Sequence, residues 1–216
     1  MTQPHNGQYP RPWMTKTCDP LHARVFIVGK NQAKAYPVDK VGNHDRHIDA
    51  VFNRNGESCD ALYDFICEGK PSKSRPIIRS LSSCLAQRGI HDVLETNVVC
   101  YSTPMSRHLA KAVHAGGVKK GEEIFHTLLS TIQPLVLIVH GQGTTTSLSG
   151  SLDILLPAPP LTPDKVVCTR IYLGDYSPLV VVIPSLAMPA AAIWSGWRSE
   201  HLALVADQVA AELERT

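Results

Sequence analysis

Four runs of apolar, mostly β-branched residues punctuate the chain, and each run ends in a short polar signature. The runs cover about residues 24–28, 92–100, 135–139 and 179–183. Runs of this composition, bounded by turn formers and separated by helical stretches, are typical of buried parallel strands in an α/β sheet. Ligands bind outside the carboxyl ends of such strands. The polar residues in or shortly after these runs are therefore candidates for function, namely Asn31, Asn97, His140 and Ser185.

The segments between the strands predict the covering layers. Helical spacing of apolar residues indicates helices over about residues 58–67, 74–89, 106–114, 121–132 and from 199 onward, with Gly116-Gly117 as a stop. A short edge strand is expected near 170–173, and the turn signals between 30 and 57 favour a long loop. Residues 1–23 are expected to form an extended lead-in outside the core, and residues 24–216 a single domain. The pattern predicts a three-layer αβα fold with a central four-stranded, mainly parallel sheet.

Composition excludes several other classes of protein. The chain has 216 residues, of which 44% are hydrophobic and 19% charged, which suits one α/β domain. It has no apolar stretch long enough for a bilayer and no secretory signal pattern at its start, so we expect an intracellular protein without a membrane partner. Six cysteines never form C-x-x-C, so we expect no metal site. The formal net charge of +2 neither indicates nor excludes a nucleic-acid partner.

Generic catalytic motifs are absent from the sequence. There is no G-x-x-x-x-G-K-[ST] phosphate loop and no G-x-S-x-G nucleophile elbow. The turn from Gly141 to Gly143 lacks the third glycine of a dinucleotide fingerprint. It is suited to hold an anion before a helix, or to serve simply as a tight strand-to-helix turn.

Three short signatures follow strands in chain order. They are Gly-Lys-Asn-Gln at 29–32, Thr-Asn-Val-Val-Cys at 96–100 and Ile-Pro-Ser-Leu-Ala-Met-Pro at 183–189. Together, over about residues 24 to 195, they resemble the uracil-DNA glycosylase superfamily. The first is similar to the G-x-N-P motif of its mismatch-specific and single-strand-selective branches, and the third to the superfamily's H-P-S-P-x-x-P motif. The resemblance implies the glycosylase fold and a monofunctional enzyme that hydrolyses the N-glycosidic bond of uracil, or of another deaminated or damaged base, in DNA. Such an enzyme is expected to require no cofactor.

The resemblance also implies a role for each matching residue in the base site. Asn97 reads the Watson–Crick edge of a flipped base, because its carboxamide matches the N3–H and O4 of uracil. Asn31 positions the attacking water, Gly29 belongs to the base-binding motif, and Phe52 is the candidate stacking ring. Simpler roles stay open: Asn97 as a strand-end amide that satisfies loop backbone, Asn31 as a turn residue and Phe52 as core.

A second set of residues is expected to contact DNA, single- or double-stranded. Pro184 and Ser185 would hold the phosphate backbone together with the turn at Gly141 and Gly143. Leu186 and Met188 form a candidate apolar wedge, or else the start of a helix with a buried methionine. The basic residues Lys70, Lys73, Arg75 and Arg79 extend a backbone-contacting face or form a solvated surface.

Three departures from the family pattern bear on activity. Ile183 stands where the family has a histidine that stabilises the departing base, Gln32 replaces a proline, and Leu186 replaces another. Losing one such hydrogen-bond donor costs about 10²–10³ in rate. His140 is the candidate replacement donor, or a structural strand-end residue. A binding module without catalysis and a nucleoside hydrolase are thus alternatives to the glycosylase, which we expect to act as a monomer.

Overall fold

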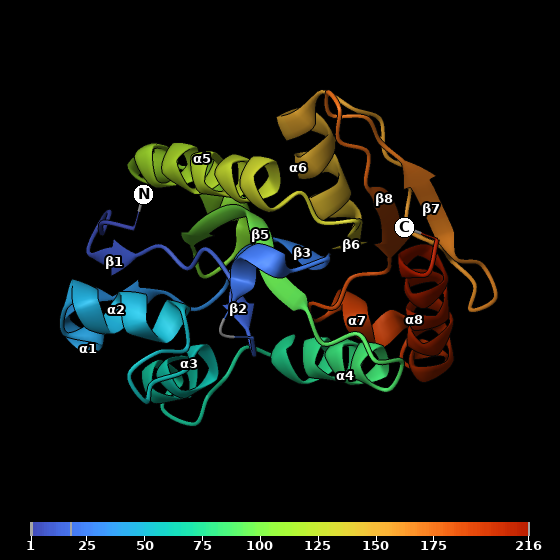
Figure 1. Ribbon diagram of the computed structural model, residues 1–216. Coiled ribbons are helices and arrows are strands. Elements are labelled where there is room, and N and C mark those ends of the chain that lie inside the picture. The colour runs from blue at the N-terminus through green and yellow to red at the C-terminus, as the bar shows by residue number, and fades with distance from the viewer. Residues whose placement is uncertain (1, 18, 216) are drawn as a thin grey trace.

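A six-stranded mixed sheet forms the centre of the protein (Figure 1). The computed structural model describes residues 2–17 and 19–215, so Met1, Cys18 and Thr216 lie outside the described residues. The strand order is β2-β5-β3-β6-β8-β7. The four inner strands are parallel and confirm the four predicted runs; they are β3 (Val25–Gln32), β5 (Val93–Ser102), β6 (Val136–His140) and β8 (Leu179–Ile183).

Two antiparallel edge strands enlarge the sheet beyond the predicted four. The strand β2 (Met14–Thr15) pairs with β5, and β7 (Val167–Arg170) pairs with β8. The predicted edge strand exists, although it begins about three residues earlier than expected. The sheet therefore has two strands more than the expected four: the edge strand β7 was predicted in addition to them, and the edge strand β2 was not.

Helices cover both faces of the sheet, as Figure 1 shows. On one face lie α5 (Ala115–Ile132) and α6 (Gln142–Leu152), and on the other α4 (Arg75–Ala86), α7 (Ala190–Ile193) and α8 (Arg198–Leu213). Alternate strand residues feed the two cores: Phe26 and Val28 belong to the first, and Val25 and Ile27 to the second. This alternation follows from the two-residue period of a strand, and it yields the expected three layers.

The helix α5 runs through the glycine pair that was expected to stop a helix. Gly117 lies inside α5, and a Cβ added there would meet the Tyr101 ring at 2.4 Å. One turn later, an added Cβ at Gly121 would lie 2.9 Å from the Cys100 nitrogen. The glycines therefore allow α5 to pack closely against β5. The predicted helix before them consists instead of two short 3-10 helices, η2 (Ser106–Ala110) and η3 (Ala112–His114).

The polar segment after β3 is structured rather than a long loop. It contains β4 (Tyr36–Pro37), α1 (Val38–Val41) and α2 (His44–Val51), and α3 (Cys59–Cys67) follows as predicted. Asn43 starts α2 by accepting the N–H of Arg46 at 2.8 Å. The buried His47 attaches the helix to the core, which hydrophobic spacing alone did not reveal.

The lead-in contributes to the core, contrary to expectation. Tyr9, Trp13 and Met14 are buried, β1 (Gln8–Tyr9) pairs with β4, and the short η1 (Pro20–His22) precedes β3. The Trp13 indole donates to the Val51 carbonyl at 2.8 Å. Among residues 2–17 and 19–215, no helix is both long and apolar enough to cross a membrane.

Candidate functional site

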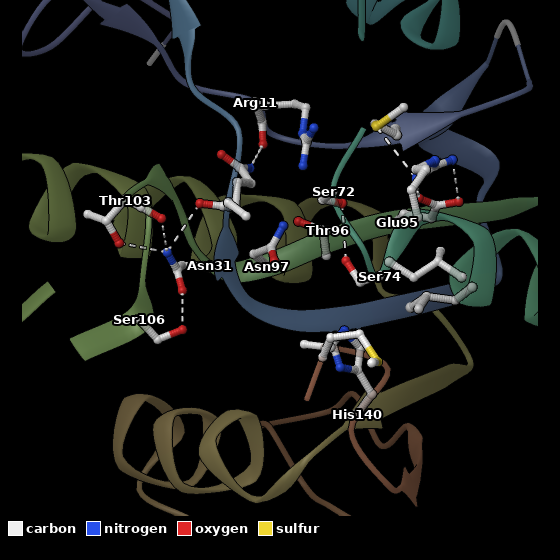
Figure 2. Close-up of a pocket in the computed structure, with 18 of the residues that line it drawn as sticks. Arg11, Asn31, Ser72, Ser74, Glu95, Thr96, Asn97, Thr103, Ser106 and His140 are labelled. Carbon is white, nitrogen blue, oxygen red and sulfur yellow. Dashed lines mark hydrogen bonds and ion pairs between the residues drawn. The ribbon is translucent and has the colours of Figure 1, made fainter. Parts of the chain in front are cut away.

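A cavity of about 420 Å³ opens at the carboxyl ends of β3, β5 and β6. Three of the strand-end residues singled out from the sequence line it, namely Asn31, Asn97 and His140 (Figure 2). Side chains from the lead-in, from α3, from the segment before α4 and from the loops after β5 and β8 complete the wall. They include Arg11, Tyr63, Ser72, Ser74, Thr103, Met105, Ser106 and Met188.

The centre of the site is a row of residues on adjacent strands. Gly29 on β3 is in register with Asn97 on β5, and Val28 is in register with Val139, the residue before His140. A Cβ added to Gly29 would lie 2.6 Å from Asn97 Oδ1 and 3.0 Å from His140 Nε2. Both polar atoms thus lie next to the space that a side chain at position 29 would occupy. The glycine is required because any larger residue would occupy the space in which they approach each other.

The His140 imidazole is neutral at pH 7. Burial lowers the pKa of His140 to about 4. Its Nδ1 is buried without a hydrogen-bond partner among the described residues, whereas Nε2 lies over Gly29 beside the cavity. Because Nδ1 faces no acceptor, the single proton is better placed on Nε2. His140 therefore offers one N–H donor to a ligand and brings no charge.

The two asparagines differ in how free they are. Within residues 2–17 and 19–215, the Asn97 carboxamide makes no hydrogen bond, and it lies at the middle of the cavity in Figure 2. The Asn31 carboxamide donates to Thr103 Oγ1 at 2.9 Å and accepts from Ser106 Oγ at 2.7 Å. Asn97 is thus available to a ligand, while Asn31 also fastens the loop that follows β5.

Arg11 enters the cavity from the lead-in, and the sequence interpretation missed it. Its guanidinium extends toward Asn97 and Ser72 in Figure 2, with the Tyr36 and Tyr63 rings 5.5 and 5.3 Å from its central carbon. The prolines at 10 and 12 indicate an irregular segment around Arg11, but they give no information on where its side chain lies.

An ion pair closes the opposite side of the cavity. Arg75 is buried at the start of α4 and donates through both terminal nitrogens to the Glu95 carboxylate, with Nη2 to Oε1 at 3.1 Å. The same Nη2 lies 3.4 Å from Asp60 Oδ1. Arg75 is therefore buried and committed to carboxylates, so neither of the two alternatives given for it, a face for a DNA backbone and a solvated surface, is correct.

Two predicted residues, Phe52 and Leu186, pack in the core and lie outside the cavity. Phe52 packs edge-to-face on Trp13, with ring centroids 5.3 Å apart, and belongs to the core as the simpler alternative proposed. Leu186 is completely buried beside Trp194, so it cannot act as a wedge. Met188 does line the cavity and is 45% exposed. Ile183 is buried in the same core as Leu186 and does not line the cavity.

The candidate phosphate-holding turns lie side by side next to His140. A Cβ added to Gly141, whose φ is +85°, would meet Ser185 Cβ at 3.0 Å. Gly141 precedes α6 and has no side chain to cap the first helical turn. A Cβ at Gly143 would lie 3.7 Å from Lys30 Cδ, so a lysine reaches over this helix start. Pro184 is buried, and Ser185 Oγ accepts the N–H of Ala187 at 3.1 Å.

A positively charged segment borders the cavity on the side of Met105 and Ser106. Arg107 and Lys111 are exposed in and after η2, and among the described residues neither forms an ion pair. Slight desolvation and the charges of Lys111, Arg107 and His114 lower the pKa of His108. This segment was predicted as a helix and its charge was not recognised, because its cations are separated by apolar residues.

Neither a metal-binding cluster among the described residues nor a similar known protein identifies the site. In the part of the chain that the structure describes, no three His, Cys, Asp or Glu side chains gather to hold a metal ion. A scan against protein-family models and a search of curated proteins gave no match for this sequence. The function is therefore inferred from the residues of the site itself.

Proposed function

We propose that this protein is a DNA glycosylase that hydrolyses the N-glycosidic bond of uracil, or of another deaminated or damaged base, without a cofactor. The observation that carries the proposal is the row of Asn97, Gly29 and His140, which presents a free carboxamide and a neutral imidazole to one cavity. The corresponding expectation is an intracellular enzyme that acts as a monomer.

Asn97 supplies the recognition of the base in this proposal. A carboxamide has one acceptor oxygen and two donor hydrogens, and it pairs with the N3–H and O4 of uracil. The Asn97 carboxamide has no partner among the described residues, so binding a base requires no internal hydrogen bond to be broken. A flipped base is recognised by such contacts to its Watson–Crick edge.

His140 supplies the donor that Ile183 lacks. These two residues are register partners on the neighbouring strands β6 and β8. The donor therefore stands one strand away from the position that the glycosylase resemblance assigns to it. Negative charge develops on the base as the glycosidic bond breaks, and an N–H group aimed at that charge stabilises the transition state.

Asn31 and the rim of the cavity complete the reaction. Asn31 Oδ1 retains a second lone pair beside its bond to Ser106, so it is able to orient a water toward the sugar. An asparagine is a weak base, so we expect slow turnover. The cations of the η2 segment and the turns at Gly141 and Ser185 suit a DNA backbone. Met188 is placed to enter the stack where the base has left.

The test is excision of uracil from synthetic single- and double-stranded oligonucleotides by the full chain. We expect alkali-labile abasic sites with the wild type and a loss of about 10²-fold or more with Asn97→Ala and His140→Ala. Leu155→Ser is a matched surface control, because Leu155 is exposed and outside the cavity. Abasic sites that form equally in all variants would refute the assignment of the site.

A binding module without catalysis is the second candidate. It is favoured by Ile183, whose buried side chain gives the usual position no donor, and by the engagement of Asn31 with the neighbouring loop. Salt-dependent DNA binding without any abasic product would support it. Nucleoside hydrolysis without DNA binding at low salt would instead support a small-molecule hydrolase.

A further inference from the structure

Three consecutive carbonyls of the lead-in are each held by a side chain from a different element. His47 of α2 contacts the Pro10 carbonyl through Nε2 at 2.9 Å, and the Gln32 amide of β3 donates to the Arg11 carbonyl. Thr96 of β5 donates to the Pro12 carbonyl at 2.7 Å. All three side chains are buried. The backbone around Arg11 is therefore fixed in place by contacts that are unusual for a simple lead-in.

The residue presented by this anchored segment is Arg11. Its guanidinium points into the cavity of the candidate site, and its Nη1 is buried without a hydrogen-bond partner among the described residues (Figure 2). Gln32, which replaces a motif proline, is the residue that holds the Arg11 carbonyl. The departure from the family pattern thus has a structural use.

The Arg11 charge has no counter-charge among the described residues. The Glu95 carboxylate on the same cavity is bound by Arg75, and Asp60 by Arg75 and Arg79. The nearby hydroxyl of Tyr36 is neutral at pH 7, because burial raises its pKa. Burial likewise raises the pKa of the Cys59 and Cys100 thiols to about 11. A partly desolvated cation without a counter-charge is costly, and an anionic ligand removes that cost.

We propose that Arg11 is a specificity-determining residue that binds an anionic oxygen group on a nucleobase-sized ligand of this cavity. The proposal rests on the proposed function for the identity of the base, while the recognition of the anion is independent of catalysis. The planar guanidinium presents parallel N–H groups that match a carboxylate or a phosphate. The hydroxyls of Ser72 and Ser74, which line the cavity 3.2 Å from each other, are further donors.

Two sources of the anion are possible, and they are distinguished by the probes. A carboxylate attached to the base is represented by 5-carboxyuracil and by uracil 6-carboxylate. A phosphate of the nucleotide is represented by deoxyuridine monophosphate, with inorganic phosphate as the minimal form. Uracil is the neutral reference of the same ring size.

The experiment is calorimetric titration of these probes into the full-length protein. We expect at least one anionic probe to bind about tenfold or more tightly than uracil, and Arg11→Gln to weaken that probe about 10- to 100-fold. Uracil itself should change little. Arg11→Lys retains the positive charge but not the paired N–H groups of the guanidinium, so its affinity for the anionic probe should lie between those of the wild type and Arg11→Gln. Arg215→Gln, outside the cavity, controls for the change in net charge.

The outcomes separate this proposal from the glycosylase assignment. Equal binding of anionic and neutral probes by the wild type, or unchanged binding by a folded Arg11→Gln, overturns the role of Arg11 even if uracil is excised. Should Arg11→Gln fail to fold, the comparison of wild type with Arg11→Lys decides in the same way. Arg11-dependent anion binding without any excision would leave this inference standing and remove the proposed function.

Discussion

Replacing Gly29 by alanine tests the row of residues at the centre of the site. The new methyl group would lie 2.6 Å from Asn97 Oδ1 and 3.0 Å from His140 Nε2. An ordinary contact is at least 3.4 Å, so the Asn97 oxygen must retreat by roughly 0.8 Å and the imidazole by roughly 0.4 Å. Asn97 has no partner among the described residues and is able to move, so overpacking should cost only about 1 kcal/mol of stability.

The effect on activity should be much larger than the effect on stability. A misplacement of about 1 Å at a reacting group costs on the order of 10²-fold in rate. We therefore expect Gly29→Ala to lose about 10²-fold in single-turnover uracil excision while it retains a cooperative thermal transition close to that of the wild type.

A matched glycine-to-alanine control exists in the same protein. Gly150 lies within α6, and a Cβ added there meets nothing within 4 Å. Gly150→Ala should raise stability by about 1 kcal/mol through helix propensity and leave excision unchanged. Excision by Gly29→Ala at the wild-type rate, with Gly150→Ala behaving as expected, would refute the reasoning that the space over Gly29 holds the reacting base.

Three further predictions address separate residues. Asn97→Ala should abolish excision without lowering the melting temperature, whereas Asn31→Ala should also lower stability by about 1–2 kcal/mol, because it releases the loop after β5; equal melting temperatures for the two variants would contradict this. Burial lowers the pKa of His47 to about 4 from 6.5, so the unfolded chain binds the proton first and urea stability should fall by up to about 3 kcal/mol as the pH drops from 6.5 to 4. A His47→Gln variant should lose that part of the pH slope, and an unchanged slope would count against it. Ile183→His should lower stability by about 2–4 kcal/mol and not accelerate excision, since its side chain faces the core and His140 already provides the donor; faster excision would show that the position reaches the base.

The parallel centre of the fold was predictable because its signal is local. Runs such as 135–139 and 179–183 are apolar throughout and mostly β-branched, and that composition at such a length is typical of a buried parallel strand. The edge strand β2 was not predicted, because it has only two residues and is held by its neighbour rather than by its own pattern. The helix α2 was not predicted, because it is mostly polar and is fixed by a cap and one buried histidine.

The site was predictable only in outline. The strand-end rule placed Asn31, Asn97 and His140 at one end of the sheet, where all three line one cavity. Asn97 and His140 lie next to Gly29 because of the register of β3 with β5 and β6. Register is set by the pairing of strands, so it cannot be read from the sequence of any one strand. Arg11 could not be placed, because the three side chains that anchor its segment come from distant parts of the chain.

The most direct test of the account is a crystal structure of the protein soaked with uracil. We predict that the base occupies the cavity over Gly29, with its N3–H and O4 paired to the Asn97 carboxamide and an oxygen within hydrogen-bond distance of His140 Nε2. Uracil bound elsewhere, or bound in the cavity without contact to Asn97, would contradict the central claim.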